Sequence, residues 1–434
     1  MSLNTHTLED ASSKSDASTI LGDARRSADA YQVVVVGAGL VGAAAALALS
    51  RQGLRVALIE RQPPREPGPA SPPHPNPLPH AGEGANVMPK PTQWDTRIYA
   101  ISPDSRHFLE SLGAWQRMDA ARVEPVYRMQ VQGDADGSLR LDAYQAGVAQ
   151  LAAILENGRL QVALWQAVES DGGITLLCPG AVEAIEWGNP YSRLVLADGT
   201  VLLAELVVGA DGADSRIRAL AGIQPTVTPY RQSGVVANFA CEKPHRGTAF
   251  QWFQGGNIMA WLPLPGQRMS LVWSTAEGEV AALLALDAPA LASRVAEAGG
   301  GRLGELQLLT PPAAFPLRLI RVPQVVMRGL VLIGDAAHGM HPLAGQGVNT
   351  GFGDAEALAS VLSQRGSARC GDPVLLQRHA RLRAEPVARM QAMTHGLHYL
   401  FGLDSASWLR NTGMKFLDRL GPVKTALIRE TADH

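Results

Sequence analysis

The sequence predicts an α/β protein in three parts: a discontinuous parallel-sheet domain, an inserted domain built on an antiparallel sheet, and a C-terminal helical region. Three observations indicate this. Buried-strand patterns followed by glycines occur in Tyr31 to Arg61 and again in Leu330 to Leu358. Between them, residues 224–318 contain short strand-like runs with tryptophans and glycine turns, a texture typical of antiparallel sheets. If the two buried strands belong to one sheet, residues 224–318 must form a domain inserted into it.

The first segment carries a dinucleotide-binding pattern. The valines of residues 33–36 are typical of a strand buried on both faces, and Gly37, Gly39 and Gly42 follow in GxGxxG spacing. These glycines allow a tight turn, close approach of a pyrophosphate, and close packing of helix on strand. A helix N-terminus offers N–H groups to phosphates, and Glu60, after the strand of residues 54–59, can accept ribose hydroxyls. The pattern predicts a Rossmann-like site without distinguishing FAD from NAD.

Bulk composition excludes several classes of function. The 434 residues suffice for two or three domains, and a net charge of −2 gives no field for nucleic acid. The 3 cysteines are far apart, so neither a disulfide framework nor a metal site is expected. No apolar run reaches the ~18 residues of a membrane span, and residues 1–30 lack a signal-peptide core. We therefore expect a cytoplasmic protein with a disordered tail at 1–30.

The domain division follows from these patterns. Proline and glycine crowd residues 63–91, which predicts an exposed loop. We predict a dinucleotide-binding domain in three parts, at 31–123, 151–223 and 319–365. A hairpin at 124–150 joins the inserted sheet domain, which spans 224–318. Helices make up the C-terminal region, 366–434. In the dinucleotide-binding domain we expect two strands within residues 181–208, around an Asp198-Gly199 turn, and a helix from about Val348.

Several polar residues are candidates with two readings each. Arg97 fits a phosphate clamp or a surface charge, and Glu156 with Asn157 fits helix capping or a cofactor contact. Asp211, at the end of a strand, fits a turn former or a cofactor contact. His338 and His341 fit a general base or loop packing. The aromatic residues of the inserted sheet fit core or pocket wall: Trp252, Phe253 and Trp261.

Three motifs together resemble the single-component flavoprotein aromatic hydroxylases, the class typified by para-hydroxybenzoate hydroxylase. They are GAGLVG at 37–42, GADGADS at 209–215 and GDAAHGMHPLAGQGVNTGFGD at 334–354. Further stretches are similar to the ubiquinone-biosynthesis branch of that class: RIYAISPDS at 97–105, LENGRLQVALWQA at 155–167 and GLHYLF at 396–401. Two departures are Gly158, which separates Arg159 from the Glu-Asn pair, and the 63–91 insert.

The resemblance implies FAD as the cofactor and gives residues their roles. Glu60 would hold the adenosine ribose, Arg97 and Asn157 the pyrophosphate region, and Asp335 the ribityl chain, while Asp211 would support the phosphate and the nicotinamide approach. The loop at 343–347 would lie under the flavin ring. It also implies further cofactor-binding residues: Gly334, Pro342, Gly347, Val348 and Asn349. The implied catalytic residues are those of the flavin-ring loop, with His341 as a base: Gly345, Gln346 and Gly347.

The implied function is hydroxylation of the ring of a prenylated phenol in ubiquinone biosynthesis, through a flavin hydroperoxide formed from O₂ with electrons from NAD(P)H. Expected partners are a quinone precursor, other ubiquinone-biosynthesis proteins and a second copy of the chain, with peripheral association at the inner membrane. Alternatives are a flavoenzyme acting on another aromatic substrate, and a non-catalytic FAD-binding scaffold at a membrane surface. The GDAAH element has no place in a simple NAD-dependent dehydrogenase.

Overall fold

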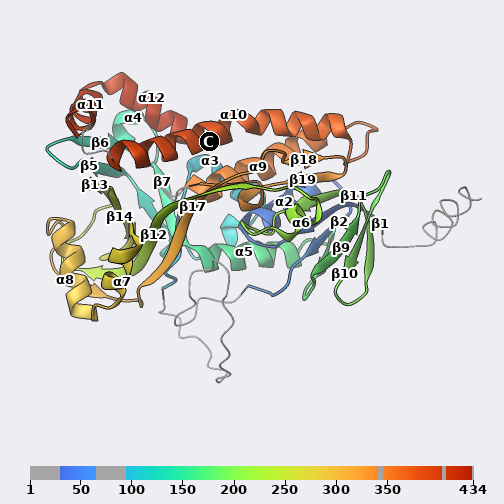
Figure 1. Cartoon of the computed structure of the whole chain (residues 1–434), viewed down its shortest axis with the longest axis horizontal. Coiled ribbons are helices and arrows are strands. Elements are labelled where there is room, and N and C mark those ends of the chain that lie inside the picture. The colour runs from blue at the N-terminus through green and yellow to red at the C-terminus, as the bar shows by residue number, and fades with distance from the viewer. Residues whose placement is uncertain (1–29, 65–93, 341–345, 403–406, 433–434) are drawn as a thin grey trace, which may run out of the picture.

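The computed structural model describes residues 30–64, 94–340, 346–402 and 407–432. A mainly parallel sheet covered by helices occupies one half of the molecule and a large, mainly antiparallel sheet the other, and the long helix α10 (Pro373–Gly402) lies along one face (Figure 1). The predicted tail, apart from Ala30, and most of the 63–91 loop lie outside the described residues.

The first sheet has eight strands and a parallel centre in the order β8-β2-β1-β11-β19. Strand β18 pairs with β19 in antiparallel fashion, and β10 joins β11 to β9. The strands are β1 (Ala30–Val36), β2 (Val56–Ile59), β8 (Ile174–Leu177), β9 (Val182–Glu186), β10 (Ser192–Leu196), β11 (Val201–Gly209), β18 (Val326–Met327) and β19 (Leu330–Leu332). The predicted discontinuous Rossmann-like sheet is thereby confirmed.

Residues 181–208 hold one strand more than expected. The two strands expected around the Asp198-Gly199 turn are β10 and β11, and an additional strand, β9, precedes them and is separated from β10 by residues 188–191. Gly188 leaves no room for a side chain there, since a Cβ would lie 2.4 Å from the Tyr191 carbonyl oxygen.

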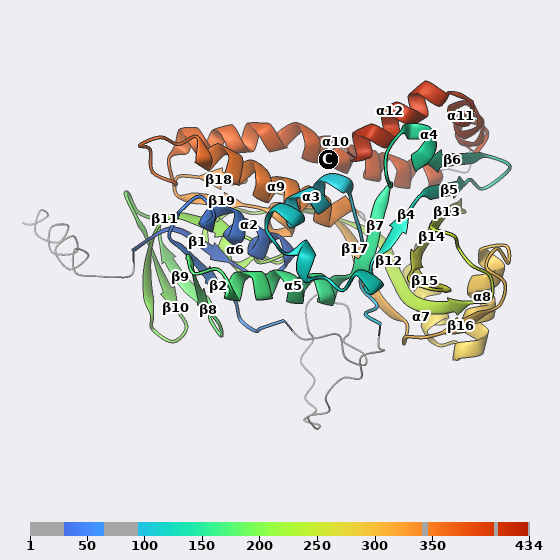
Figure 2. The ribbon, with the colours of Figure 1, turned by 180° about the vertical axis from the view of Figure 1, so that it is seen from behind.

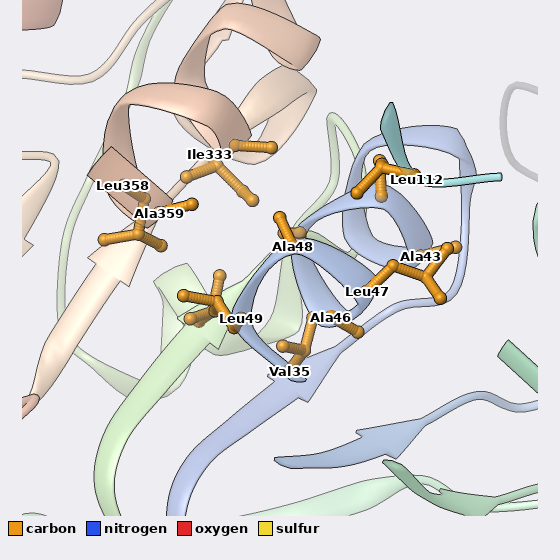
Figure 3. Close-up of a cluster of buried hydrophobic side chains, with 14 of the residues drawn as sticks. Val35, Ala43, Ala46, Leu47, Ala48, Leu49, Leu112, Ile333, Leu358 and Ala359 are labelled. Carbon is orange, nitrogen blue, oxygen red and sulfur yellow. The ribbon is translucent and has the colours of Figure 1, made fainter. Parts of the chain in front are cut away.

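Helix α2 (Leu40–Ser50) packs in the centre of the parallel half, and its alanines allow close contact on several sides. Figure 3 shows Ala43, Ala46 and Ala48 among Val35, Ile333, Leu358 and their neighbours. The packing requires Gly42, because a Cβ there would lie 1.9 Å from the Gly37 carbonyl oxygen. The helices nearby are α3 (Pro103–Ser111), α5 (Asn157–Glu169), α6 (Arg216–Leu220) and α9 (Gln346–Ser363). Helix α9 begins at Gln346, slightly before the predicted start at Val348.

The second sheet has nine strands in the order β20-β17-β12-β15-β14-β13-β5-β6, with β16 beside β12. They are β5 (Arg128–Gln132), β6 (Ser138–Asp142), β12 (Thr226–Cys241), β13 (Thr248–Gln254), β14 (Asn257–Leu264), β15 (Arg268–Ala276), β16 (Leu306–Leu308), β17 (Ala313–Arg321) and β20 (His338–Gly339). Trp252 and Trp261 are buried in the cluster beneath α7 (Glu277–Leu284) and α8 (Ala288–Ala298), and Phe253 stacks on Phe401. All three aromatic residues therefore belong to cores.

A small sheet and the last helices complete the fold. Strands β3 (Ile98–Ile101), β7 (Ala152–Glu156) and β4 (Glu124–Val126) form the small sheet near the junction of the two halves (Figure 2). Helix α11 (Ser407–Arg419) packs on β6, and α12 (Gly421–Ala432) packs on α4 (Ala143–Ala146). Short 3₁₀ helices lie at Trp115–Arg117, Ala120–Arg122 and Gly334–Ala336. Across the described ranges, every helix is too short or too polar to cross a membrane.

Candidate functional site

A cavity of about 1410 Å³ lies where the two large sheets meet. One side is formed by the residues that follow β1, β2, β11 and β19, and the other by the nine-stranded sheet. Ligands of open parallel sheets bind at these carboxyl ends of the strands. Single-ligand pockets usually measure roughly 300–1,000 Å³, so this cavity has room for a large cofactor and a second ligand.

The first glycine turn lines the cavity as predicted for a dinucleotide site. Gly37 has a φ of 99°, and a Cβ there would lie 2.5 Å from the Ala210 carbonyl oxygen. Gly39 instead faces open space directly before α2 begins, because a Cβ at this position would have nothing within 4 Å. Glu60 stands beside this turn, because its Oε2 accepts the N–H of Ala38 at 2.7 Å. The turn thus brings N–H groups and a carboxylate to one end of the cavity.

Arg97 and Asn157 also line the cavity, and the backbone joins them. The N–H of Asn157 donates to the Arg97 carbonyl oxygen at 2.9 Å. The Asp95 carboxylate then accepts the N–H of Arg97 at 2.9 Å and that of Gly158 at 3.0 Å. Two segments far apart in sequence are therefore held as one platform.

Glu156 supports this platform in a way that the sequence did not predict. Its side chain is fully buried and makes no helix-capping bond, so the capping interpretation was wrong for it. It accepts the Asp95 N–H at 2.8 Å and pairs with Arg122 at 2.7 Å and Arg159 at 2.9 Å. Arg159, displaced by Gly158, thus stabilises the platform through Glu156. The only sequence signal was an acid at the end of an apolar strand.

The charge of Arg97 is fixed by its neighbours. Tyr99, followed by Asp335 and Asp95, raises the pKa of Arg97 against the effect of burial. Burial in turn raises the pKa of Tyr99, although Arg97 partly offsets this. At neutral pH the guanidinium is therefore charged and the phenol is neutral, which places a permanent cation on the cavity wall, suited to a phosphate.

Asp211 lines the cavity, but its carboxylate serves the local turn. It accepts the hydroxyl of Ser215 and the N–H of Ile217, the latter at 3.0 Å, at the start of α6. Arg218 ties the loop to the segment after β19, because it donates to the carbonyl oxygens of Ala213 at 2.7 Å and Ala336 at 2.9 Å. These contacts favour the turn-forming interpretation of Asp211.

The second glycine motif presents Asp335 to the cavity. Gly334 has a φ of 58°, and Asp335 is exposed on the lining. His338 lies behind this turn, buried, with Nε2 bonded to Asp354 at 2.6 Å. This burial favours packing over a role as general base for His338.

The N-terminus of α9 forms the remaining wall. Gln346, Gly347 and Val348 line the cavity, and a Cβ on Gly347 would have nothing within 4 Å. Asn349 is buried and points to β3, where it accepts the Ser102 N–H at 3.1 Å and donates to the Ala100 carbonyl oxygen at 2.9 Å. The predicted residues His341, Pro342 and Gly345 lie outside the described residues.

The chain matches known families along most of its length. The family described as "FAD binding domain" matches residues 96–391, and that described as "FAD dependent oxidoreductase" matches residues 32–71. The 3-demethoxyubiquinol 3-hydroxylase of Escherichia coli is 34% identical over 406 residues, covering 92% of this chain and 97% of that protein. The chain belongs to the ubiquinone-biosynthesis branch of the FAD-dependent aromatic hydroxylases. The predicted family and the cofactor FAD are thus confirmed, with NAD(P)H the donor typical of the class.

Further relatives agree with this membership. Ubiquinone hydroxylase UbiL of Rhodospirillum rubrum is 33% identical, covering 94% of this hydroxylase and 90% of the relative. The fold is that of Pseudomonas aeruginosa PqsL, solved in complex with 2-aminobenzoylacetate, with a TM-score of 0.71 and 23% identity over 89% of this chain and all (100%) of that one.

The cavity of this hydroxylase fits FAD. Gly39 and Gly347 each leave open space on the lining, where a bound group could approach the backbone. The lining includes a carboxylate, a permanent cation and a second carboxylate, at Glu60, Arg97 and Asp335. The two carboxylates can accept hydrogen bonds from ribose hydroxyls and from a polyhydroxy chain, and the cation can pair with a pyrophosphate.

Proposed function

We propose that this hydroxylase introduces a hydroxyl group into the aromatic ring of a prenylated phenol or quinone precursor, using O₂ and electrons from NAD(P)H. One observation carries the choice of substrate class: beside the FAD-facing residues, the cavity continues along an apolar wall. The apolar residues of that wall come mainly from the nine-stranded sheet and the small sheet: Met129, Leu151, Ile154, Val236, Ala249, Ile258, Ala260, Leu262 and Val272. Such a wall favours an aromatic ring with a hydrocarbon tail.

The proposed arrangement of FAD assigns one part of the cofactor to each polar group on the cavity lining. Glu60 binds the adenosine ribose, the α2 N-terminus and the Arg97–Asn157 platform bind the pyrophosphate, and Asp335 binds the ribityl chain. Gln346, Gly347 and Val348 then lie against the ring. Support for this arrangement comes from the lining itself, which includes the residues after β1, β2 and β19 together with the start of α9.

Bound FAD, once reduced by NAD(P)H, supplies the electrons that activate O₂ for insertion into the ring. The chain's own residues position the reactants and exclude water. N–H groups at the α9 N-terminus, near Gly347, favour negative charge on a reduced ring, and their backbone geometry is set before reaction. The apolar wall fixes the substrate ring and keeps solvent away from it.

The test is turnover by the purified holoenzyme. We expect a prenylated phenol to stimulate NAD(P)H oxidation with matching O₂ uptake and hydroxylated product, and a deletion strain to accumulate the unhydroxylated precursor. Ala260→Phe, which narrows the apolar wall, should raise KM for the prenylated phenol while FAD content stays constant. Full FAD content without product from any such phenol contradicts the proposal and favours a scaffold.

Association with the inner membrane belongs to the same proposal. Trp408 and Phe416 on α11 have exposed fractions of 77% and 63%, and exposed aromatic rings favour a membrane interface. We expect the wild-type protein to float with liposomes of bacterial lipids. The double variant Trp408→Ser, Phe416→Ser should float less. The matched control is Tyr127→Ser, an exposed aromatic residue beside β5. Equal flotation of all three proteins contradicts the assignment of this surface.

Assembly completes the proposal. We expect a homo-oligomer and a complex with other ubiquinone-biosynthesis proteins, and light scattering of the purified chain, alone and with those proteins, measures both. A monomer that stays monomeric in their presence contradicts this part.

A further inference from the structure

Asp354, in the middle of α9, bonds two other segments at once, the turn of residues 334–338 and α10. Its Oδ2 accepts the N–H of Gly334 at 2.9 Å and bonds Nε2 of His338 at 2.6 Å. Its Oδ1 accepts Nε of Arg383, on α10, at 2.7 Å. Arg383 donates a further bond to the Thr350 carbonyl oxygen at 3.0 Å. One carboxylate therefore bonds the first and fifth residues of the turn that carries Asp335.

The carboxylate is almost inaccessible to water, with an exposed fraction of 2% for Asp354 and 5% for His338. A buried carboxylate is stable only when it is paired and hydrogen-bonded, and here every bond comes from a donor on the turn of residues 334–338 or on α10. Packing alone does not require this, because the neighbouring core of α2, α9 and β19 is apolar. The polar group instead fixes the position of the turn relative to α9.

Charged groups reinforce this contact. Burial alone would raise the pKa of Asp354, but His338 and then Arg383 lower it well below its usual range. Burial alone would lower the pKa of His338, but Asp354 raises it, with Asp335 adding to this and Arg383 opposing it. His379 also faces Asp354 from α10, with burial lowering its pKa to about 4, so it is neutral. The raised pKa of His338 favours the protonated ring, which pairs with the Asp354 carboxylate.

We propose that Asp354 is a positioning residue for FAD. Through its bonds to Gly334 and His338 it holds Asp335 in register with Gly347 and Val348 at the start of its own helix. This rests on the proposed arrangement of FAD, in which those two segments contact the ribityl chain and the ring. Asp354 itself does not line the cavity, so it acts through the turn and the helix.

The experiment measures FAD affinity by reconstituting FAD-free protein, alongside its thermal unfolding without FAD. Asp354→Asn keeps the shape but removes the charge that pairs with His338 and Arg383. We expect its FAD dissociation constant to rise by about tenfold or more, the usual effect of losing a charged hydrogen bond. The matched control is Asp171→Asn, because Asp171 bonds Ser50 at 2.7 Å and Gly173 at 2.9 Å behind α2, away from the cavity. It should unfold at a lower temperature yet keep wild-type affinity.

A second variant keeps the proposal testable if Asp354→Asn does not fold. In the wild type, FAD affinity should decline as the pH rises through the raised pKa of His338, because the neutral ring pairs less strongly with Asp354. His338→Gln should remove this decline. An unchanged dissociation constant in folded Asp354→Asn, or an unchanged pH dependence in His338→Gln, overturns the inference. If the wild type itself binds no FAD or makes no hydroxylated product, the proposed function fails instead.

Discussion

The carboxylate of Glu60 and the backbone N–H of Ala38 are joined by a 2.7 Å hydrogen bond. This contact fastens the end of β2 to the glycine turn after β1, so one residue orients the turn and still faces the cavity. Its Oε1 also accepts the N–H of Arg61 at 2.7 Å and that of Gln62 at 3.3 Å, so both carboxylate oxygens help to shape this end of the cavity.

Glu60→Ala should therefore weaken FAD binding in two ways, by loss of the ribose contact and by loosening of the turn. The wild-type protein should be yellow with about one FAD per chain, held noncovalently, and Glu60→Ala and Asp335→Ala should each lose flavin during purification. Absorbance at the flavin band, relative to protein, measures this. The control is Glu186→Ala, whose exposed pair with Arg193 contributes little. Retention of FAD by both cavity variants contradicts the assigned contacts.

Glu156→Gln should be among the most destabilising single changes on the cavity side. It leaves Arg122 and Arg159 without their buried partner, and breaking a buried pair typically costs about 3–5 kcal/mol. Denaturant unfolding measures the free energy of unfolding. The control Glu110→Gln removes only the half-exposed pair with Arg106, so its loss should stay below about 1 kcal/mol. Similar losses in the two variants contradict the proposed platform.

Gly347→Val should separate holding the flavin from using it. The side chain would enter open space on the lining, where the ring is proposed to lie, and displace the nearby N–H groups. Loss of one such donor costs ~3 kcal/mol in a transition state, about a hundredfold in rate. FAD content should fall much less than substrate-stimulated NAD(P)H oxidation and product formation. Near-normal hydroxylation with full flavin content contradicts a role for this wall.

His379 should limit stability in acid. Burial lowers its pKa to about 4, below the ordinary value near 6.5, so the folded state favours the neutral ring. Its contribution is present above about pH 6.5 and declines as the pH falls toward 4, by on the order of 3 kcal/mol in total. Urea unfolding at pH 7.5 and 5 should show a smaller difference for His379→Leu than for the wild type. An equal difference assigns the acid sensitivity to other groups.

The parts of the site predicted from sequence are those whose function depends on contiguous residues. Gly37, Gly39 and Glu60 belong to a single strand-turn-helix-strand unit, so their spacing alone predicted that they meet at one end of the sheet. Asp335 follows the same logic at the end of β19. The family resemblance supplied FAD, which spacing did not distinguish from NAD.

The residues that were missed depend on partners far along the chain. Glu156 meets Arg122 through the small sheet, and Asp354 meets Arg383 through the packing of α10 on α9. Neither pairing has a local signal, because an acid in a strand or helix fits capping or solvent exposure equally well. Asn349 was expected to contact the cofactor, but its side-chain amide bonds residues 100 and 102, at the end of β3, which lie far from it in sequence.

The order of strands in the parallel sheet has a consequence for synthesis of the chain. The central strand β1 is made first, yet its neighbour β11 and then β19 follow only after long intervening segments. Because β19 comes after β17, almost the whole nine-stranded sheet can leave the ribosome and fold before the nucleotide-binding half is complete. During that interval the valines of β1 lack part of their cover, and such surfaces aggregate readily. We therefore expect β1 to be exposed to aggregation longer than the later strands, and the proposed FAD site to be complete only after β19 and α9 have been made.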